Sequence, residues 1–233
     1  MYVPPIYSSR DDEWPREVVR RFPLATLVTN GPGPPHATHL PAVPAPGAPQ
    51  TGPLAGLVIV GHIPRANPHW AALERGTQGR LIFAGPHGYI TPAVYQATPA
   101  VPTWDFAAIH LLGTLVPLAG LDATLEVVTH TVEVCEAAFG DGWDPAGSLD
   151  HFRAIGPRVG AFRFHVASAE SMFKLSQELT EDTRERLIKR LSDSRPGTAR
   201  DLADLMRAYG PSQPRMLRTV PHRACWLRPC PRR

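Results

Sequence analysis

The spacing of apolar residues changes along this chain, and the change separates expected strands from expected helices. Short apolar runs rich in β-branched side chains predict strands at 23–30, 36–43, 54–63, 80–95, 107–118 and 161–173. Glycines and prolines interrupt these runs and predict a turn at 31–35 and loops at 44–53 and 96–104. Because only a short turn separates the first two strands, we expect them to pair as an antiparallel hairpin.

Helical periodicity is clearest in residues 121–139, where apolar side chains recur on one face at Leu125, Val128, Val132 and Cys135. Start and stop signals predict shorter helices at 11–22, 67–76, 180–193 and 198–210. Strands and helices do not alternate in a βαβ rhythm. This pattern is typical of an α+β fold, and we expect a β-barrel with peripheral helices.

The composition changes this picture little. Of the 233 residues, 43% are hydrophobic and 19% are charged, which is ordinary for a globular protein with a full core. No apolar run approaches the roughly 20 residues of a membrane helix, and the N-terminus carries acids and prolines where a secretory signal would be basic and then apolar. We therefore expect a cytoplasmic protein without a membrane span. The cysteines lack zinc-site spacing and are expected to be free thiols.

The sequence pI of about 9.0 raises the question of a nucleic-acid partner, so the location of the charge matters. Residues 211–233 contain six arginines and no acid, which leaves 18 basic against 21 acidic residues elsewhere, a net charge of about −3. The body lacks both a phosphate-neutralising excess and any helix-turn-helix, zinc-finger or RNA-binding signature. We expect no specific nucleic-acid binding. The expected division is a cofactor-binding domain at 1–210 and a disordered basic tail at 211–233.

Seven unusual segments occur in a fixed order: MYVPPIY, FPLATLVTN, HATHLP, GHIPRANPHW, GPHGYITPAVY, VPTWDFAAIHLLG and FKLSQ. Together they resemble the PaiB-like family, described as FMN-binding negative transcriptional regulators with a split-barrel fold, from Met1 to about Met206. The resemblance implies a homodimer with cofactor pockets between the two barrels. Within that family the chain is also similar to the haem-dependent piperazate synthases, which cyclise N5-hydroxy-L-ornithine to L-piperazic acid by forming an N–N bond.

Four departures from the flavin-type pattern favour haem b over FMN. PTWNY becomes PTWDF at Asp105 and Phe106, KLSQN becomes KLSQE at Glu178, ISPSWY becomes ITPAVY, and ARANPQW becomes PRANPHW. Each change alters a hydrogen-bonding group. If these groups hold a flavin ring or its phosphate, their loss and the added carboxylates weaken FMN binding. FMN remains the alternative cofactor.

His62 is the first candidate for an axial haem ligand. It ends an apolar strand and is followed by Arg65, which could pair with a haem propionate. A structural histidine bonded to backbone is the equally weighted alternative. His39 and His110 are competing ligands, and each could instead orient another group or be a buried histidine satisfied by a neighbour.

The resemblance implies further cofactor-binding residues. They are Thr38 in HATHLP, Asn67 in RANP, Trp104 in PTWDF, and Lys174 and Gln177 in FKLSQ. Each has a plainer interpretation, because asparagine can cap the helix that follows it and lysine at a strand end can simply be solvated.

These observations predict a haem-dependent enzyme that forms an N–N bond in a small amino-acid substrate, with His62 as the metal ligand and Asp105 as the proton acceptor. The alternatives are an FMN-binding regulator or flavin-dependent oxidoreductase of the same family, and a dimeric binding protein without catalysis. The motifs of common hydrolases and nucleotide enzymes are missing from the sequence.

Overall fold

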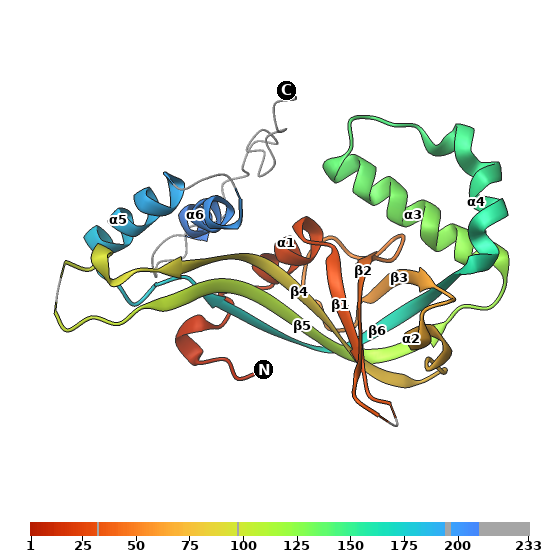
Figure 1. The fold of residues 1–233 in the computed structure, drawn as a ribbon, viewed down its shortest axis with the longest axis horizontal. Helices are drawn as coiled ribbons and strands as arrows, with labels where there is room; N and C mark the ends of the chain where they lie inside the picture. Colours follow the sequence, from red (N-terminus) through yellow and green to blue (C-terminus); the bar gives the residue numbers. More distant parts are fainter. Residues whose placement is uncertain (32, 97, 194–196, 210–233) are drawn as a thin grey trace. The chain divides into compact units, whose positions relative to one another are not determined.

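The computed structural model describes residues 1–209 except 32, 97 and 194–196 (Figure 1). Its strands are β1 (Leu24–Thr29), β2 (His36–Pro44), β3 (Val58–Pro64), β4 (Thr77–Ile90), β5 (Thr103–Pro117) and β6 (Val159–Lys174). Its α-helices are α1 (Glu13–Arg21), α2 (Pro68–Ala71), α3 (Leu121–Phe139), α4 (Leu149–Ile155), α5 (Glu181–Ser192) and α6 (Thr198–Tyr209). Four 3-10 turns are η1 (Pro5–Tyr7), η2 (Pro92–Val94), η3 (Pro145–Ser148) and η4 (Gly156–Arg158).

The six strands close a barrel in the order β1-β2-β3-β6-β5-β4. The pairs β1–β2, β1–β4, β2–β3 and β3–β6 are antiparallel. The predicted hairpin is confirmed, with Thr26 opposite His39 and Leu27 opposite Thr38. A closed barrel with helices around it confirms the predicted α+β fold.

The described residues form two compact units. The first contains residues 1, 9–84 and 108–171, and the second contains residues 2–8, 85–107 and those from 172 onward. Strands β4, β5 and β6 each have residues in both units. The predicted domain boundary near residue 210 stays a prediction, because the tail at 211–233 lies outside the described residues.

All six strands contribute side chains to the core of the first unit. Its largest fully buried residues are Leu27, Leu40, Ile59, Ile63, Leu81, Phe83, Ile109, Leu111, Phe162 and Phe164. Helix α3 packs on the outer face of β2 and β3, where Val127 meets Val43, Val60 and Ala161 in a second apolar cluster (Figure 1). One face of these strands therefore fills the barrel, and part of the other is covered by a helix.

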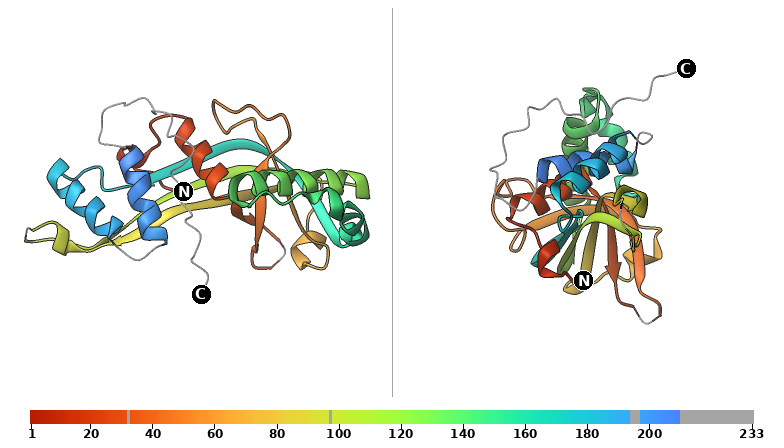
Figure 2. Two further views of the ribbon diagram at one scale, coloured as in Figure 1. Left: turned by 90° about the horizontal axis from the view of Figure 1, so that it is seen from above. Right: turned by 90° about the vertical axis from the view of Figure 1, so that its left-hand side faces the viewer.

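Helices α5 and α6 of the second unit lie side by side (Figure 2). The Arg184 guanidinium of α5 donates a hydrogen bond to the carbonyl oxygen of Met206 in α6 at 2.6 Å. The rings of Phe173 and Tyr209 stack with their centroids 5.4 Å apart. Among the helices described, none combines the length and the apolar character needed to cross a bilayer.

Candidate functional site

His62 lies on the outer face of β3. Successive strand residues face opposite sides, and Gly61 faces the barrel interior, because a Cβ there would lie 2.8 Å from the Phe162 ring. His62 therefore points outward, opposite Ala161 of β6. Since Ala161 belongs to the apolar cluster under α3, the imidazole stands beside an apolar surface.

The electronic state of His62 suits a metal ligand. Its side chain is half-buried, its Nδ1 atom is fully buried, and no hydrogen-bond partner of Nδ1 exists among the described residues. Burial lowers the pKa of His62, so the imidazole is neutral near pH 7. A neutral imidazole keeps one nitrogen lone pair, which is what a haem iron or another soft metal binds.

Arg65 follows the end of β3 and is held in one orientation. Its Nε donates to the carbonyl oxygen of Val159 at 2.9 Å, and its guanidinium lies 5.0 Å from the centre of the Trp70 ring. Trp70 in turn packs on Gly160, where a Cβ would lie only 2.4 Å from the ring. Within the part of the chain that the structure describes, the two Nη groups of Arg65 are unpaired. An oriented guanidinium with two available donors suits a carboxylate or a phosphate.

Thr38 and Asn67, both predicted to bind a cofactor, are hydrogen-bonded to each other. The Nδ2 atom of Asn67 donates to Oγ1 of Thr38 at 3.2 Å. Its Oδ1 accepts from the backbone N–H of His69 at 2.9 Å, so Asn67 also caps α2 as its plainer interpretation predicts. The structure thus places these two candidates together, within the same unit as His62 and Arg65.

His69 is a residue that the sequence did not single out. It is buried, and its two ring nitrogens lie 2.9 Å from the hydroxyl oxygens of Thr29 and Thr38. A four-residue helix has too few positions to show a buried face by periodicity. The signal available in the sequence was the departure of PHW from the PQW of the resembled family.

His110 is a weaker ligand candidate than His62. The Arg80 guanidinium, which can only donate, lies 3.0 Å from Nδ1 of His110. Nδ1 must therefore accept, and in a neutral ring the proton is on Nε2. Burial, followed by the charge of Arg80, lowers the pKa of His110. Its Nε2 could bind a metal only if the Arg80 hydrogen bond were broken.

His39 remains a competing candidate for the metal ligand. It lies exposed on the outer face of β2, and its Nδ1 is 2.9 Å from Oγ1 of Thr26. A threonine hydroxyl can donate or accept, so this contact does not fix the tautomer. The exposure of His39 makes it less suited than His62 to an apolar cofactor.

Asp105 lies in the second unit and is fully buried. Its Oδ2 accepts from the Ser176 hydroxyl at 2.5 Å, and its Oδ1 has no partner in the described structure. Burial, partly offset by the Ser176 hydrogen bond and by Lys174, raises the pKa of Asp105 to about 7. Such a carboxyl can exchange a proton near neutral pH, as the predicted role requires. Because it is fully enclosed, a substrate reaches it only if its covering side chains move.

The remaining candidates of the second unit have structural partners. Lys174 donates from Nζ to Oγ1 of Thr103. The Gln177 amide accepts from the backbone N–H of Leu175 at 2.7 Å and donates to the carbonyl oxygen of Phe173 at 2.6 Å, so it shapes the turn after β6. Trp104 is 50% exposed, its Nε1 donates to Nδ1 of His87 at 3.1 Å, and its ring is tilted against the rings of His87 and Tyr89.

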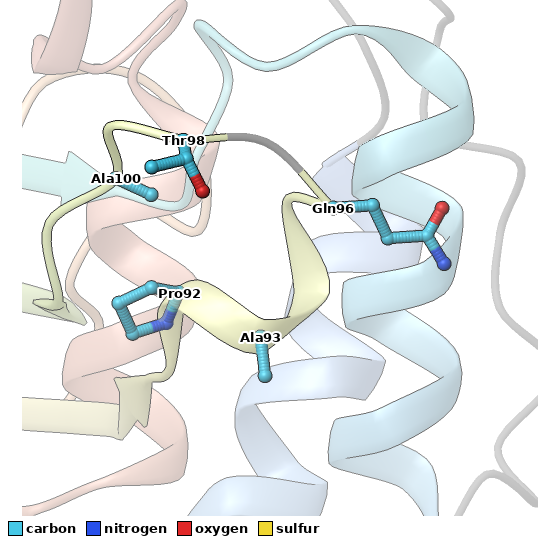
Figure 3. A pocket seen from close by; sticks show the side chains of 5 residues that line it. All are labelled: Pro92, Ala93, Gln96, Thr98 and Ala100. Carbon is cyan, nitrogen blue, oxygen red and sulfur yellow. The ribbon is translucent and has the colours of Figure 1, made fainter.

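The second unit also has a shallow hollow of about 430 Å³ in the connection between β4 and β5 (Figure 3). The residues that line it are Pro92, Ala93, Gln96, Thr98 and Ala100. None of these side chains is ionisable, and none is a predicted site residue. The hollow therefore adds no chemistry to the candidates described above.

A model of the family described as "Putative FMN-binding domain" matches residues 1–168. This chain belongs to that family. The FMN-binding-domain match contains the predicted site residues from Thr38 to His110 and ends before Lys174 and Gln177. This match confirms the family expected from the seven segments. It does not test membership of the piperazate-synthase subgroup.

Two relatives match along most of their length. The chain is 29% identical over 208 residues to the protease synthase and sporulation protein PAI 2 of Bacillus subtilis (strain 168), covering 88% of this chain and 96% of the relative. It is 23% identical over 247 residues to an uncharacterised protein of Emericella nidulans, covering 90% of this chain and 98% of that protein.

A solved structure supports the fold. The chain is similar to a conserved hypothetical protein from Mycobacterium tuberculosis with a TM-score of 0.54 and 14% sequence identity, covering 78% of this chain and 95% of that one. At this identity the likeness concerns the fold alone. It agrees with a split barrel as the fold of this FMN-binding-domain family member.

Proposed function

We propose that this chain is a haem-dependent enzyme of the piperazate-synthase type, in which His62 would hold the haem iron. The observation that carries the proposal is the half-buried, neutral imidazole of His62, whose buried Nδ1 has no hydrogen-bond partner in the described residues. Because Nδ1 is enclosed, Nε2 is the ring nitrogen that would bind a haem iron, with the proton of the neutral ring on Nδ1.

His62 distinguishes haem from FMN better than Arg65 does. The Arg65 guanidinium, with its two available Nη groups, would hold a haem propionate or an FMN phosphate equally well. A flavin has no metal centre to which a neutral imidazole lone pair could bind. Arg65 therefore supports an anionic cofactor of either kind, and His62 supports haem.

The proposed reaction closes N5-hydroxy-L-ornithine into a six-membered ring. The α-nitrogen bonds to the hydroxylamine nitrogen, the N–O bond breaks, and the oxygen leaves as water, so no external oxidant or reductant is needed. A bound haem would supply a Lewis acid that polarises the hydroxylamine N–O bond. The protein must accept a proton from the α-ammonium and return one to the leaving oxygen.

Asp105 is the proposed proton acceptor. With its pKa raised to about 7, it is ionised in a substantial fraction of molecules at neutral pH and can also give the proton back. The Ser176 hydroxyl, bonded to Oδ2 at 2.5 Å, fixes the carboxyl and leaves Oδ1 for the proton. Asp105→Asn would keep the shape of the side chain and remove this function.

The test is a turnover assay with the haem-reconstituted protein and N5-hydroxy-L-ornithine. We expect a product lighter than the substrate by one water, with retained α-carboxylate, and slower turnover in Asp105→Asn at unchanged haem content. L-ornithine, which lacks the N–O bond, is the matched control substrate and should not react. Protein that holds haem but forms no cyclic product would overturn the enzymatic proposal.

The second candidate is an FMN-binding protein, favoured by the family match over residues 1–168. Purified protein with a flavin absorption spectrum would support it over haem. The family resemblance also supports a homodimer, which light scattering tests. A concentration-independent monomer would remove the basis for a pocket built by two chains.

A further inference from the structure

His69 is completely enclosed although it is a polar side chain. It is 2% exposed, and His36 stacks over it with the ring centroids 5.1 Å apart and an interplanar angle of 18°. Burial, followed by the neighbouring His36, lowers the pKa of His69. The ring is therefore neutral, with one donor and one acceptor nitrogen.

The hydrogen bonds around His69 tie three elements together. Asn67 donates to Oγ1 of Thr38, which also lies 2.9 Å from Nδ1 of His69. Oγ1 of Thr29 lies 2.9 Å from Nε2 of His69, so the neutral ring can donate to one hydroxyl and accept from the other. His69 thus connects the first turn of α2 to β1 and β2 through both of its ring nitrogens.

The position of the Arg65 guanidinium depends on the same turn of α2. Trp70 directly follows His69 in α2. The Arg65 guanidinium lies 5.0 Å from the centre of the Trp70 ring, which also packs on Gly160. If α2 shifted, Trp70 would move off Gly160 and the guanidinium would lose one of its two supports. The buried histidine and the exposed arginine are therefore linked through one short helix.

We infer that His69 is a positioning residue for the Arg65 anion-binding group and thereby sets the preference for a cofactor that carries a carboxylate or a phosphate. The inference rests on the proposed cofactor site. His69 touches no cofactor itself, because both of its nitrogens are bonded to threonine hydroxyls. Its effect acts through the placement of α2, Trp70 and Arg65.

The measured quantity is the dissociation constant of the uncharged form of a cofactor divided by that of its anionic form. This ratio isolates the contribution of the anionic group. Haem b is compared with its dimethyl ester, or FMN with riboflavin, for whichever cofactor the wild-type protein binds. We expect the wild type to favour the anionic form by about 10-fold or more, as for a charge-assisted bidentate pair. Arg65→Met, which keeps an apolar stem over Trp70, should bring this ratio close to one.

His69→Leu should lower the same ratio by about 10-fold while the affinity for the uncharged form stays within about twofold. Thr29→Val should act in the same direction, because it removes the hydroxyl bonded to Nε2 of His69, and Thr29→Ser, which restores the hydroxyl, should return the ratio to the wild-type value. Thr131→Val is the matched control, because it removes a buried hydroxyl whose one bond among the described residues is to the Val127 carbonyl within α3. It should leave the ratio unchanged.

The outcomes separate this inference from the proposed function. A wild type that binds neither cofactor overturns both. If the wild type, His69→Leu and Thr29→Val all prefer the anionic form to the same degree, the inference alone is overturned. If Thr131→Val lowers the ratio as much as His69→Leu does, the effect reflects a general loss of stability, and the inference about His69 is also overturned. If His69→Leu does not fold, the comparison of Thr29→Val with Thr29→Ser decides.

Discussion

The Ser176 hydroxyl donates to Oδ2 of the fully buried Asp105 at 2.5 Å, and Ser176 adopts a backbone φ of 53° in doing so. A positive φ is unfavourable for a residue with a Cβ, by roughly 1–3 kcal/mol. The surroundings of Asp105 are charged, with Lys174 and Arg184 lowering its pKa, Glu178 raising it, and Tyr7 and Tyr95 lying within its field. The second unit therefore combines a buried carboxyl with an unfavourable backbone conformation at the residue that donates to it, which is consistent with the proposed role of Asp105.

Asp105 should make stability depend on pH. Its pKa rises from 3.8 in the unfolded chain to about 7 in the folded one, so the folded state binds the proton more tightly between these values. The contribution of Asp105 to the free energy of unfolding is complete below about pH 4 and falls by about 4 kcal/mol as the pH rises through 7. Urea titrations at about pH 5 and pH 8 should show roughly 3 kcal/mol of this loss in the wild type and a smaller loss in Asp105→Asn. Equal losses in the two proteins would contradict the assignment.

Gly160 should resist substitution because of Trp70. A Cβ at Gly160 would lie 2.4 Å from the indole, so Gly160→Ala should lower the free energy of unfolding by about 1–3 kcal/mol. Gly33→Ala is the control, since a Cβ there meets no atom within 4 Å. Urea denaturation of both variants measures the difference, and equal stabilities would mean that Trp70 does not pack as described.

Arg80 should hold the pKa of His110 down. The guanidinium donates to Nδ1 at 3.0 Å, which favours the neutral ring, and its removal in Arg80→Met leaves burial as the main remaining cause. The pKa of His110 should therefore rise in that variant, as followed by NMR titration of the imidazole protons. An unchanged or lower pKa of His110 in Arg80→Met would contradict this role of Arg80.

The barrel could be predicted from the sequence because each strand carries its own signal. Alternation in β5 places Ile109 and Leu111 inside and His110 outside, and the hairpin of β1 and β2 follows from the short turn between them. Helix α3 was predicted with its observed bounds. Helix α4 was missed, because its seven residues have neither a capping side-chain hydrogen bond nor a fully buried face.

The site could be predicted only in part, because contacts between distant segments leave no local pattern. His62 and Arg65 stand in one segment and could be chosen together. The bond between Thr38 and Asn67 depends on how β2 meets α2, and the enclosure of Asp105 depends on Ser176, 71 positions away in sequence. His69 was missed for the same reason, since both its partners lie on β1 and β2.

The most direct test of the proposed haem site compares absorption spectra of the wild type with His62→Ala, His39→Ala and His110→Ala after haem reconstitution. The wild type should take up haem with the Soret band of a histidine-ligated iron. His62→Ala should lose the haem or shift to the spectrum of an unligated or water-ligated iron, with the other two unchanged. A wild-type spectrum in His62→Ala, or a wild-type protein that takes up FMN and never haem, would contradict the account.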